Sequence, residues 1–388
     1  MEKLKLVIVE PVIPKYRVPL FERLAAVPEI DLTVLADLET EDQLNQYDGR
    51  IHRFRAVHLA ERKAWAFLFR PGLFELLRRL DPDVVVLKGN PRDLSQLSAM
   101  LYCRKAGIPF GVWSMFYRIG ERRWITALLT RYMGSIADLL LSYGERGSRE
   151  LRELGIAAEK IAVLHNCIDE GPIKAGRDRV RDSDLAGFKS AMGLDEKRIL
   201  LQVVRMTAIK RTDFLLKAYA VLTARRPDTL LVLIGGGPLE DEMRRLAEDL
   251  GIRDRVRFVG PLYDEAALSL WYKSADVFVM ATCIGLSIHH AMAYGVPVVT
   301  DDNPLTQTAE FEVLQDGING LTYRAGDADD FVAKVSRILD DSVLRRELSQ
   351  AAVRRVEEDY SIDRMAERFA SAVQRLYAGR GHDIAVKV

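Results

Sequence analysis

The sequence is poor in residues that mark several protein classes. Its 388 residues include only three cysteines, Cys103, Cys167 and Cys283, which lie far apart and lack metal-ligand spacing. So sparse and odd a number argues against a secreted disulfide scaffold and favours a reducing compartment, so we expect a cytoplasmic protein. The 56 lysines and arginines balance 56 aspartates and glutamates. This zero net charge provides no field that would draw the molecule to nucleic acid.

Long hydrophobic runs are also absent. No window approaches the roughly 20 apolar residues of a membrane span, and the apolar run in MEKLKLVIVEPVIP is too short for a signal peptide. Membrane contact would therefore be peripheral. Segments 61–80 and 118–140 mix arginine with aromatic residues, and five apolar residues share one helical face of the second: Trp124, Ile125, Leu128, Leu129 and Tyr132. Such helices either lie in an anionic membrane surface or pack on a sheet, and both interpretations stay open.

The chain alternates short apolar runs with longer amphipathic segments. The runs that predict strands are 4–9, 31–36, 83–89, 109–114, 138–143, 160–166, 199–205, 230–235, 256–260, 276–281, 296–300 and 320–324. Because helical spacing lies between them, the pattern predicts an α/β protein with parallel, doubly wound sheets. The charged stretch 171–197 is interpreted as a connection between two domains, and 359–379 as a final amphipathic helix.

Two motifs follow strands of the second half. Gly235, Gly236 and Gly237 stand between a strand and a helix, where glycine either lets backbone amides approach an anion or makes a tight turn. Their spacing fits neither a Walker loop nor a dinucleotide fingerprint. Arg205 ends another strand and Lys210 comes five residues later. Such a cation pair suits a diphosphate, although a solvated basic turn has the same composition.

A third motif, TCIGLSIHHAMAYGVPVVT, covers residues 282–300. Its amides at Gly285, Leu286 and Ser287 open a predicted helix and are suited to phosphate oxygens. His289 and His290 are adjacent and point about 100° apart on a helix, whereas two ligands of one metal need a spacing of three or four residues. We therefore expect no metal site, and we expect His289 to be a packed residue.

Taken in order, the motifs resemble the retaining, nucleotide-sugar-dependent glycosyltransferases of the GT-B fold, in particular glycosyltransferase family four. The resemblance runs over roughly 160–378 and includes HNCID at 165–169, the Arg205 and Lys210 pair, IGGGP, WYKSADVFVMAT and the third motif. It implies two doubly wound Rossmann-like domains with an interdomain cleft. These are an acceptor-side domain at 1–170, a nucleotide-sugar-binding domain at 171–360, and a helix within 361–388 that crosses back to the first domain.

The resemblance also implies roles for individual residues. Arg205 and Lys210 would bind the diphosphate of the sugar nucleotide. Two family glutamates, which touch the donor sugar and the ribose hydroxyls, are replaced here by Thr282 and His290. Both replacements still hydrogen-bond hydroxyl groups, but neither brings a carboxylate. Glu310 or Glu312 would supply one, and we favour Glu310 because it comes first after the next strand and loop.

The N-terminal half departs from the family as well. The loop EPVIPKYRVPLFERL lacks the glycines of many relatives, and VWSMFYR lacks their histidine. We expect the acceptor wall to be formed by the remaining polar and aromatic residues of this half, namely Tyr16, Arg17, Trp113, Tyr117 and Asn166. The absence of a required side-chain base suits a front-face retaining mechanism, in which the leaving phosphate takes the acceptor proton without a metal or other cofactor.

The predicted function is transfer of a sugar from a nucleoside-diphosphate sugar to a glycan or lipid-linked acceptor in cell-surface polysaccharide or glycoconjugate synthesis. The place of action would be the cytoplasm, or its membrane face if contact is peripheral. Two alternatives stay open. The missing glutamates motivate a catalytically silent GT-B module that binds a sugar nucleotide or a partner transferase. A sugar-nucleotide epimerase is less favoured, because its carboxylate and histidine pattern is not visible.

Overall fold

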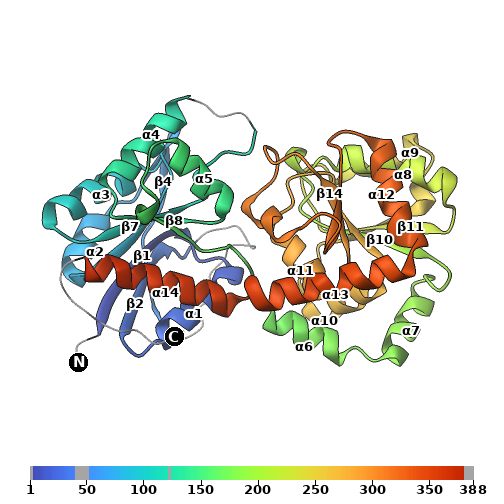
Figure 1. Cartoon of the computed structure of the whole chain (residues 1–388), viewed down its shortest axis with the longest axis horizontal. Coiled ribbons are helices and arrows are strands. Elements are labelled where there is room, and N and C mark those ends of the chain that lie inside the picture. Colours follow the sequence, from blue (N-terminus) through green and yellow to red (C-terminus); the bar gives the residue numbers. More distant parts are fainter. Residues whose placement is uncertain (1–2, 40–51, 121–123, 380–388) are drawn as a thin grey trace. The chain divides into compact units, whose positions relative to one another are not determined.

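The computed structural model describes residues 3–39, 52–120 and 124–379. The described residues divide into two compact units (Figure 1). Unit 1 combines the chain up to Asn166 with the chain from Ile362, and unit 2 is Cys167–Ser361. Each unit has its own parallel sheet and apolar core, which confirms the predicted α/β architecture with two Rossmann-like halves. Within the described ranges, no helix is long and apolar enough to span a membrane.

Unit 1 is built on a seven-stranded parallel sheet in the order β3-β2-β1-β6-β7-β8-β9. Its strands are β1 (Leu4–Val12), β2 (Ile30–Asp37), β3 (Arg55–His58), β6 (Val84–Lys88), β7 (Phe110–Ser114), β8 (Leu139–Ser142) and β9 (Ile161–Val163). The central strands are nearly continuous buried apolar runs, as parallel sheets covered on both faces require. The helices are η1 (Lys15–Arg17), α1 (Val18–Ala26), α2 (Leu73–Leu80), α3 (Leu94–Ala106), α4 (Trp124–Ile136), α5 (Glu145–Glu153), η2 (Ala158–Lys160) and α14 (Ile362–Ala378).

Helix α14 belongs to unit 1 although it follows unit 2 in the chain. It packs beside α1 and against β8, and Figure 1 shows it lying along this unit. Phe369 meets Trp113 of β7 edge to face, with ring centroids 5.2 Å apart. Phe369 and Met365 are fully buried, so α14 completes the apolar covering of the sheet.

Segment 61–80 is not the single amphipathic helix that its composition predicts. It forms an antiparallel hairpin of β4 (Arg62–Ala64) and β5 (Phe67–Phe69), followed by α2. Pro71 disfavours a helical Arg70, and the buried Arg70 is held by an ion pair of 2.7 Å to Asp93. These tertiary contacts override the helical pattern and leave Trp65, with φ of 57°, 97% exposed at the hairpin turn.

Unit 2 is built on a six-stranded parallel sheet in the order β12-β11-β10-β13-β14-β15. Its strands are β10 (Arg198–Val203), β11 (Thr229–Ile234), β12 (Val256–Gly260), β13 (Val277–Val279), β14 (Val298–Asp301) and β15 (Gly320–Tyr323). The helices are α6 (Gly171–Arg179), α7 (Asp182–Ala191), η3 (Ala208–Lys210), α8 (Thr212–Arg225), α9 (Glu240–Asp249), η4 (Arg253–Arg255), α10 (Glu265–Ser274), α11 (Ser287–Ala293), η5 (Ala309–Val313), α12 (Ala328–Asp340) and α13 (Ser342–Asp359).

The stretch interpreted as a connection, 171–197, is largely helical and part of unit 2. Helices α6 and α7 both pack on α10. Arg177 of α6 donates a hydrogen bond of 2.8 Å to the carbonyl of Ala293 at the end of α11. The many charged residues that made this stretch look like a connection lie on the exposed faces of the two helices. There Arg181 pairs with Asp184 at 2.9 Å.

Candidate functional site

The candidate donor site lies at the carboxyl edge of the unit 2 sheet, where the strand order reverses. Strands β10 and β13 are neighbours, and the strands that follow them in sequence extend to opposite sides. Ligands of doubly wound sheets bind at this topological position. Arg205 follows β10, and the loop 280–286 follows β13, so both predicted segments flank the reversal point.

The glycine loop after β11 is shaped by the neighbouring strand end. Gly235 and Gly237 have φ values of 122° and 153°, and a side chain on either would collide with the backbone carbonyl of Val204 or Met206. The amides of those two residues donate back to β11 and the loop at 2.9 and 2.8 Å. Gly236 packs against the loop that follows β12. Gly235 and Gly237 are therefore required by close backbone approach within the protein, whereas Gly236 faces the side chain of Pro261.

The two predicted diphosphate ligands are placed differently. Arg205 lies between Val204 and Met206, whose backbone amides donate hydrogen bonds to Ile234 and Gly236. Arg205 itself is exposed. Lys210 reaches across to the third motif, where its Nζ donates to the carbonyl of Cys283 at 2.5 Å. Cys283 has a φ of 51°, an unfavourable value for a residue with a side chain. A Cβ on Gly285 would lie 3.9 Å from the Lys210 Nζ, so the cation stands beside this loop.

Thr282, which occupies the first replaced glutamate position, is linked to a carboxylate by hydrogen bonds. Its hydroxyl donates to Thr306 Oγ1 at 2.8 Å, and the Thr306 hydroxyl lies 3.3 Å from Asp301 Oδ2. Gln307 donates to the other Asp301 oxygen and accepts from the amide of Ile284 at 2.8 Å. Burial raises the pKa of Asp301 to about 6, even though Thr282, Thr306 and Gln307 each act to lower it.

His290, at the second replaced position, pairs with a carboxylate from another helix. Its Nε2 lies 3.1 Å from Oε1 of Glu265, and the same oxygen accepts from the Tyr294 hydroxyl at 2.5 Å. The rings of His290 and Tyr294 both stack on Tyr272, with centroid distances of 4.8 and 4.9 Å. Burial alone would raise the pKa of Glu265, but the bonds from His290 and Tyr294 bring that pKa below its ordinary value. His289, in contrast, is completely buried.

Glu265 reaches this position because α10 begins there. The Asp264 side chain caps the helix by accepting a hydrogen bond of 2.7 Å from the amide of Ala267, which makes Glu265 the first helical residue. A carboxylate in a first turn is also favoured by the helix dipole. The sequence analysis did not find Glu265, although an Asp-Glu pair after a strand that ends at the sheet edge was a usable signal.

The predicted Glu310 lies in η5 and is 7% exposed. The pKa of the Cys283 thiol is raised by burial, lowered by Lys210 and raised again by Glu310, so Glu310 lies within electrostatic reach of the third motif. Leu286 and Ser287 lie at the start of α11, a helix of seven residues. In the part of the chain that the structure describes, no three histidine, cysteine, aspartate or glutamate side chains are grouped to hold a metal ion.

Unit 1 brings together four of the five predicted acceptor-side residues. Arg17 donates to Asn166 Oδ1 at 2.7 Å, and its guanidinium lies 4.5 Å from the Trp113 ring and 5.1 Å from the Tyr16 ring. Tyr117 is not among these contacts, since its ring is covered by the Arg146 guanidinium at 3.9 Å.

Two charged residues of this cluster were not predicted. Lys88 ends β6, and its Nζ forms an ion pair of 2.8 Å with Glu10 of β1, donates to the Tyr143 hydroxyl at 2.8 Å and lies 3.7 Å from the Trp113 ring centroid. Burial would lower the pKa of Lys88, but Glu10 and Tyr143 raise it above its ordinary value. The available signal was a single charge at the carboxyl end of an otherwise apolar strand.

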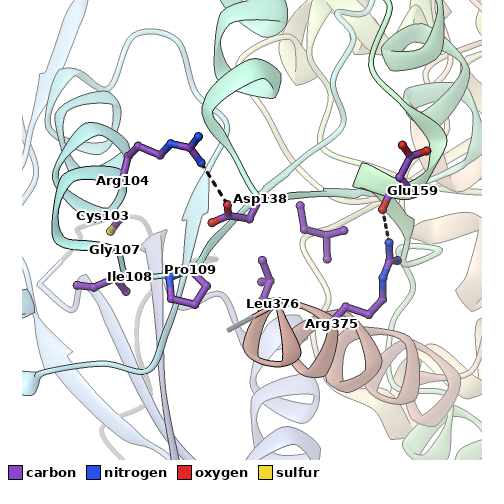
Figure 2. A pocket seen from close by; sticks show the side chains of 11 residues that line it. Cys103, Arg104, Gly107, Ile108, Pro109, Asp138, Glu159, Arg375 and Leu376 are labelled. Carbon is purple, nitrogen blue, oxygen red and sulfur yellow. Dashed lines mark hydrogen bonds and ion pairs between the residues drawn. The ribbon is translucent and has the colours of Figure 1, made fainter. Parts of the chain in front are cut away.

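A separate cavity of about 370 Å³ lies at the opposite edge of the unit 1 sheet (Figure 2). Pro109 and Asp138, which line it, precede β7 and β8, and Arg375 of α14 forms another part of the wall. Arg104 forms an ion pair of 3.6 Å with Asp138, and Arg375 donates to the backbone carbonyl of Glu159. The cavity therefore stands apart from the strand ends where the predicted residues gather.

Both halves of the chain match known family profiles. Residues 188–355 match the profile described as glycosyl transferases group 1, and residues 17–167 match the glycosyl transferase 4-like domain. The D-inositol 3-phosphate glycosyltransferase 2 of Catenulispora acidiphila is 32% identical over 218 residues, 53% of this chain and 48% of that protein. The corresponding Frankia alni protein is 28% identical over 335 residues, 78% of this chain and 77% of that protein. The chain spans about half the length of the first of these relatives.

Solved structures agree with this chain in fold at low sequence identity. Anabaena HepE in complex with UDP has a TM-score of 0.75 at 15% identity, covering 95% of this chain and 98% of that one. Sucrose-phosphate synthase from Thermosynechococcus elongatus has a TM-score of 0.73 at 18% identity, covering 97% and 100%. The solved structures show that the chain has a GT-B-like fold, and the two profile matches show that its halves are similar to a group 1 glycosyltransferase domain and a glycosyl transferase 4-like domain.

Proposed function

We propose that the chain is a retaining glycosyltransferase that moves a sugar from a nucleoside-diphosphate sugar to a glycan or lipid-linked acceptor. The observation that carries the proposal is the placement of two cations, Arg205 and Lys210, at the point where the unit 2 sheet reverses its strand order. A diphosphate bound there receives planar two-point bonding from arginine and a compact charge from lysine. The neighbour HepE is described in complex with UDP and with UDP-glucose, which supports this ligand class.

The proposed chemistry requires little beyond positioning and charge stabilisation. As the bond between sugar and diphosphate breaks, negative charge grows on the leaving phosphate, and Lys210 and Arg205 stabilise it. The leaving phosphate then takes the proton of the acceptor hydroxyl, so no side-chain base and no metal are needed. On the acceptor side, Tyr16 would contact the acceptor, because it is 41% exposed while Arg17 and Trp113 beside it are buried.

A peripheral contact with an anionic membrane belongs to the same proposal, because a lipid-linked acceptor is reached from a membrane surface. Helix α4 exposes Trp124, Leu128 and Tyr132, which are spaced four residues apart along one face, and Arg131 is exposed beside them. The hairpin adds Trp65, Phe67 and Phe69. Aromatic residues mixed with arginine suit the interface between acyl chains and headgroups.

A panel of UDP-, GDP- and other activated sugars tests the proposal. We expect one nucleotide family to raise the melting temperature, and the matching sugar nucleotide to be consumed with retention at the anomeric carbon, as followed by NMR. Stabilisation by a nucleotide without turnover on any glycan or lipid-linked acceptor would instead support the silent module, which the replaced glutamates favour. Inversion at the anomeric carbon would contradict the retaining mechanism, and no nucleotide binding would contradict both functions.

A further inference from the structure

We propose that Gln307 is a positioning residue for Lys210. It acts through the peptide group that joins Cys283 to Ile284. The inference deepens the proposed function and rests on it, because it takes Lys210 to bind the diphosphate of the donor. It gives a role to a buried side chain that follows β14 and lies outside the three sequence motifs.

One peptide group connects the two side chains. Its N–H, from Ile284, donates a hydrogen bond of 2.8 Å to Gln307 Oε1. Its carbonyl, from Cys283, accepts a hydrogen bond of 2.5 Å from Lys210 Nζ. Because the N–H and the C=O of a planar trans peptide point in opposite directions, Gln307 and the Lys210 ammonium lie at its two ends. Hydrogen bonds arranged in such a series polarise and strengthen one another.

The end of β14 holds the Gln307 side chain in one orientation. Its Nε2 donates to the Asp301 carboxylate, to the Asp301 carbonyl at 3.1 Å and to Thr300 Oγ1 at 3.2 Å. A carboxylate and a carbonyl only accept hydrogen bonds, so Nε2 must face them and Oε1 must face Ile284. The residue is 1% exposed. Gln307 therefore ties the loop after β13 to the neighbouring strand.

The next peptide group of the loop is held as well. The Thr308 hydroxyl donates to the carbonyl of Ile284, so both backbone polar groups of Ile284 are bound by side chains. Cys283 before it has a φ of 51°, which a residue with a side chain keeps only where its surroundings determine it. The bonds from Gln307 and Thr308 fix the backbone that follows Cys283. They thereby fix the direction of the carbonyl that Lys210 meets.

This arrangement gives Lys210 a fixed position and leaves it donors for a ligand. A lysine ammonium is a compact charge on a flexible four-carbon stem, so its position depends on what it bonds. Of its three N–H donors, the carbonyl of Cys283 takes one. The thiol of the same residue, a weak acceptor, lies 3.8 Å from Nζ. The other donors can meet phosphate oxygens with the charge already in place.

The test measures how much a second phosphate adds to nucleotide binding. UDP, GDP, ADP and the matching monophosphates are titrated calorimetrically into the wild type and its variants. We expect the wild type to bind the best diphosphate about 10- to 100-fold more tightly than its monophosphate. Lys210→Ala should lower this ratio about 10-fold. Gln307→Met keeps the length of the side chain but removes its amide, and should lower the ratio about 3- to 10-fold with monophosphate affinity unchanged.

A double variant distinguishes positioning of Lys210 from an independent effect of Gln307. If Gln307 acts through the lysine, Gln307→Met should cause almost no further loss of the ratio in the Lys210→Ala background. Losses that multiply in the double variant would overturn the proposal. Gln202→Met is the matched control, because Gln202 is another fully buried glutamine of unit 2 and its Nε2 meets Met280 Sδ at 3.3 Å. It should keep the wild-type ratio.

The Thr308 variants test the same backbone without altering Gln307. Thr308→Val removes the hydroxyl at nearly constant volume and should lower the ratio about 2- to 3-fold, whereas Thr308→Ser should keep it. A folded Gln307→Met with the wild-type ratio would make the proposal wrong. If that variant does not fold, an unchanged ratio in Thr308→Val would do so instead.

The two levels of proposal fail in different ways. If no diphosphate binds the wild type, or if Lys210→Ala keeps the wild-type ratio, the diphosphate site of the proposed function fails and the inference with it. If Lys210→Ala lowers the ratio while the Gln307 and Thr308 variants do not, the proposed function stands and the inference alone is wrong.

Discussion

The two units have the same strand order around the point where it reverses, but they place different charged residues at the strand ends there. In unit 1 the ends of the adjacent strands β1 and β6 carry Glu10 and Lys88, which neutralise each other in an ion pair of 2.8 Å. In unit 2 the equivalent strand β10 leads to an exposed Arg205, and Lys210 bonds a backbone carbonyl. A shared topology therefore provides two equivalent places, and the residues at the strand ends decide which of them is suited to an anionic ligand.

The largest effect on stability should come from breaking the ion pair between Lys88 and Glu10 in unit 1. Lys88→Met leaves Glu10, 5% exposed, without its ion pair partner and should lower the free energy of unfolding by about 3–5 kcal/mol, measured in urea. The double variant with Glu10→Gln should recover most of this loss. If the single variant is as stable as the wild type, the ion pair does not stabilise unit 1, and the proposed contrast with the strand ends of unit 2 is wrong.

Removing Arg205 or Lys210 of unit 2 should affect turnover more than stability. Lys210→Ala and Arg205→Ala should each lower kcat/KM by about 100- to 1,000-fold, because each removes a positive charge that would stabilise the leaving diphosphate. Lys217→Ala, an exposed lysine on α8, is the matched control and should leave kcat/KM unchanged. Unchanged kinetics in both site variants would contradict the assignment of this edge as the diphosphate site.

The buried Asp301 should make unit 2 pH-dependent in a defined direction. Its pKa of about 6 in the folded state exceeds the ordinary value of 3.8, so its contribution to stability is greatest below pH 3.8 and is lost as pH rises to about 6. Asp301→Asn should therefore raise the free energy of unfolding by roughly 2–3 kcal/mol above pH 6 and by much less near pH 4. A variant that is less stable than the wild type at pH 7.5 would show that the ionised carboxylate stabilises the loop.

The smallest effect on stability should come from the exposed aromatic residues of unit 1. Trp65→Ala and Trp124→Ala should change the free energy of unfolding by no more than about 0.5 kcal/mol, because both side chains lie in solvent. The same variants should weaken sedimentation with vesicles of phosphatidylglycerol and phosphatidylcholine. Tyr263→Ala, an exposed aromatic of unit 2, is the control. Equal vesicle binding by all three variants would remove the membrane contact from the proposal.

The sequence predicted the sheets well and the site only in part. Every predicted strand is present with ends within three residues, because buried parallel strands are continuous apolar runs. The hairpin around Trp65 was missed, since the buried Arg70–Asp93 pair that supports it joins separate elements. Glu265 and Lys88 were missed for the same reason. Their partners His290 and Tyr143 lie 25 and 55 residues away in the chain, and spacing carries no information about such pairs.

The return of α14 to unit 1 has a consequence for how the protein is made. All residues of unit 2, Cys167–Ser361, leave the ribosome before Phe369 and the rest of α14 are available to cover the unit 1 sheet. Domains generally fold as units during synthesis. Unit 2 is therefore synthesised completely before unit 1. Until α14 is made, the surface of unit 1 beside Trp113 stays uncovered. A nascent chain stopped at residue 361 would hold one finished unit and one unfinished unit.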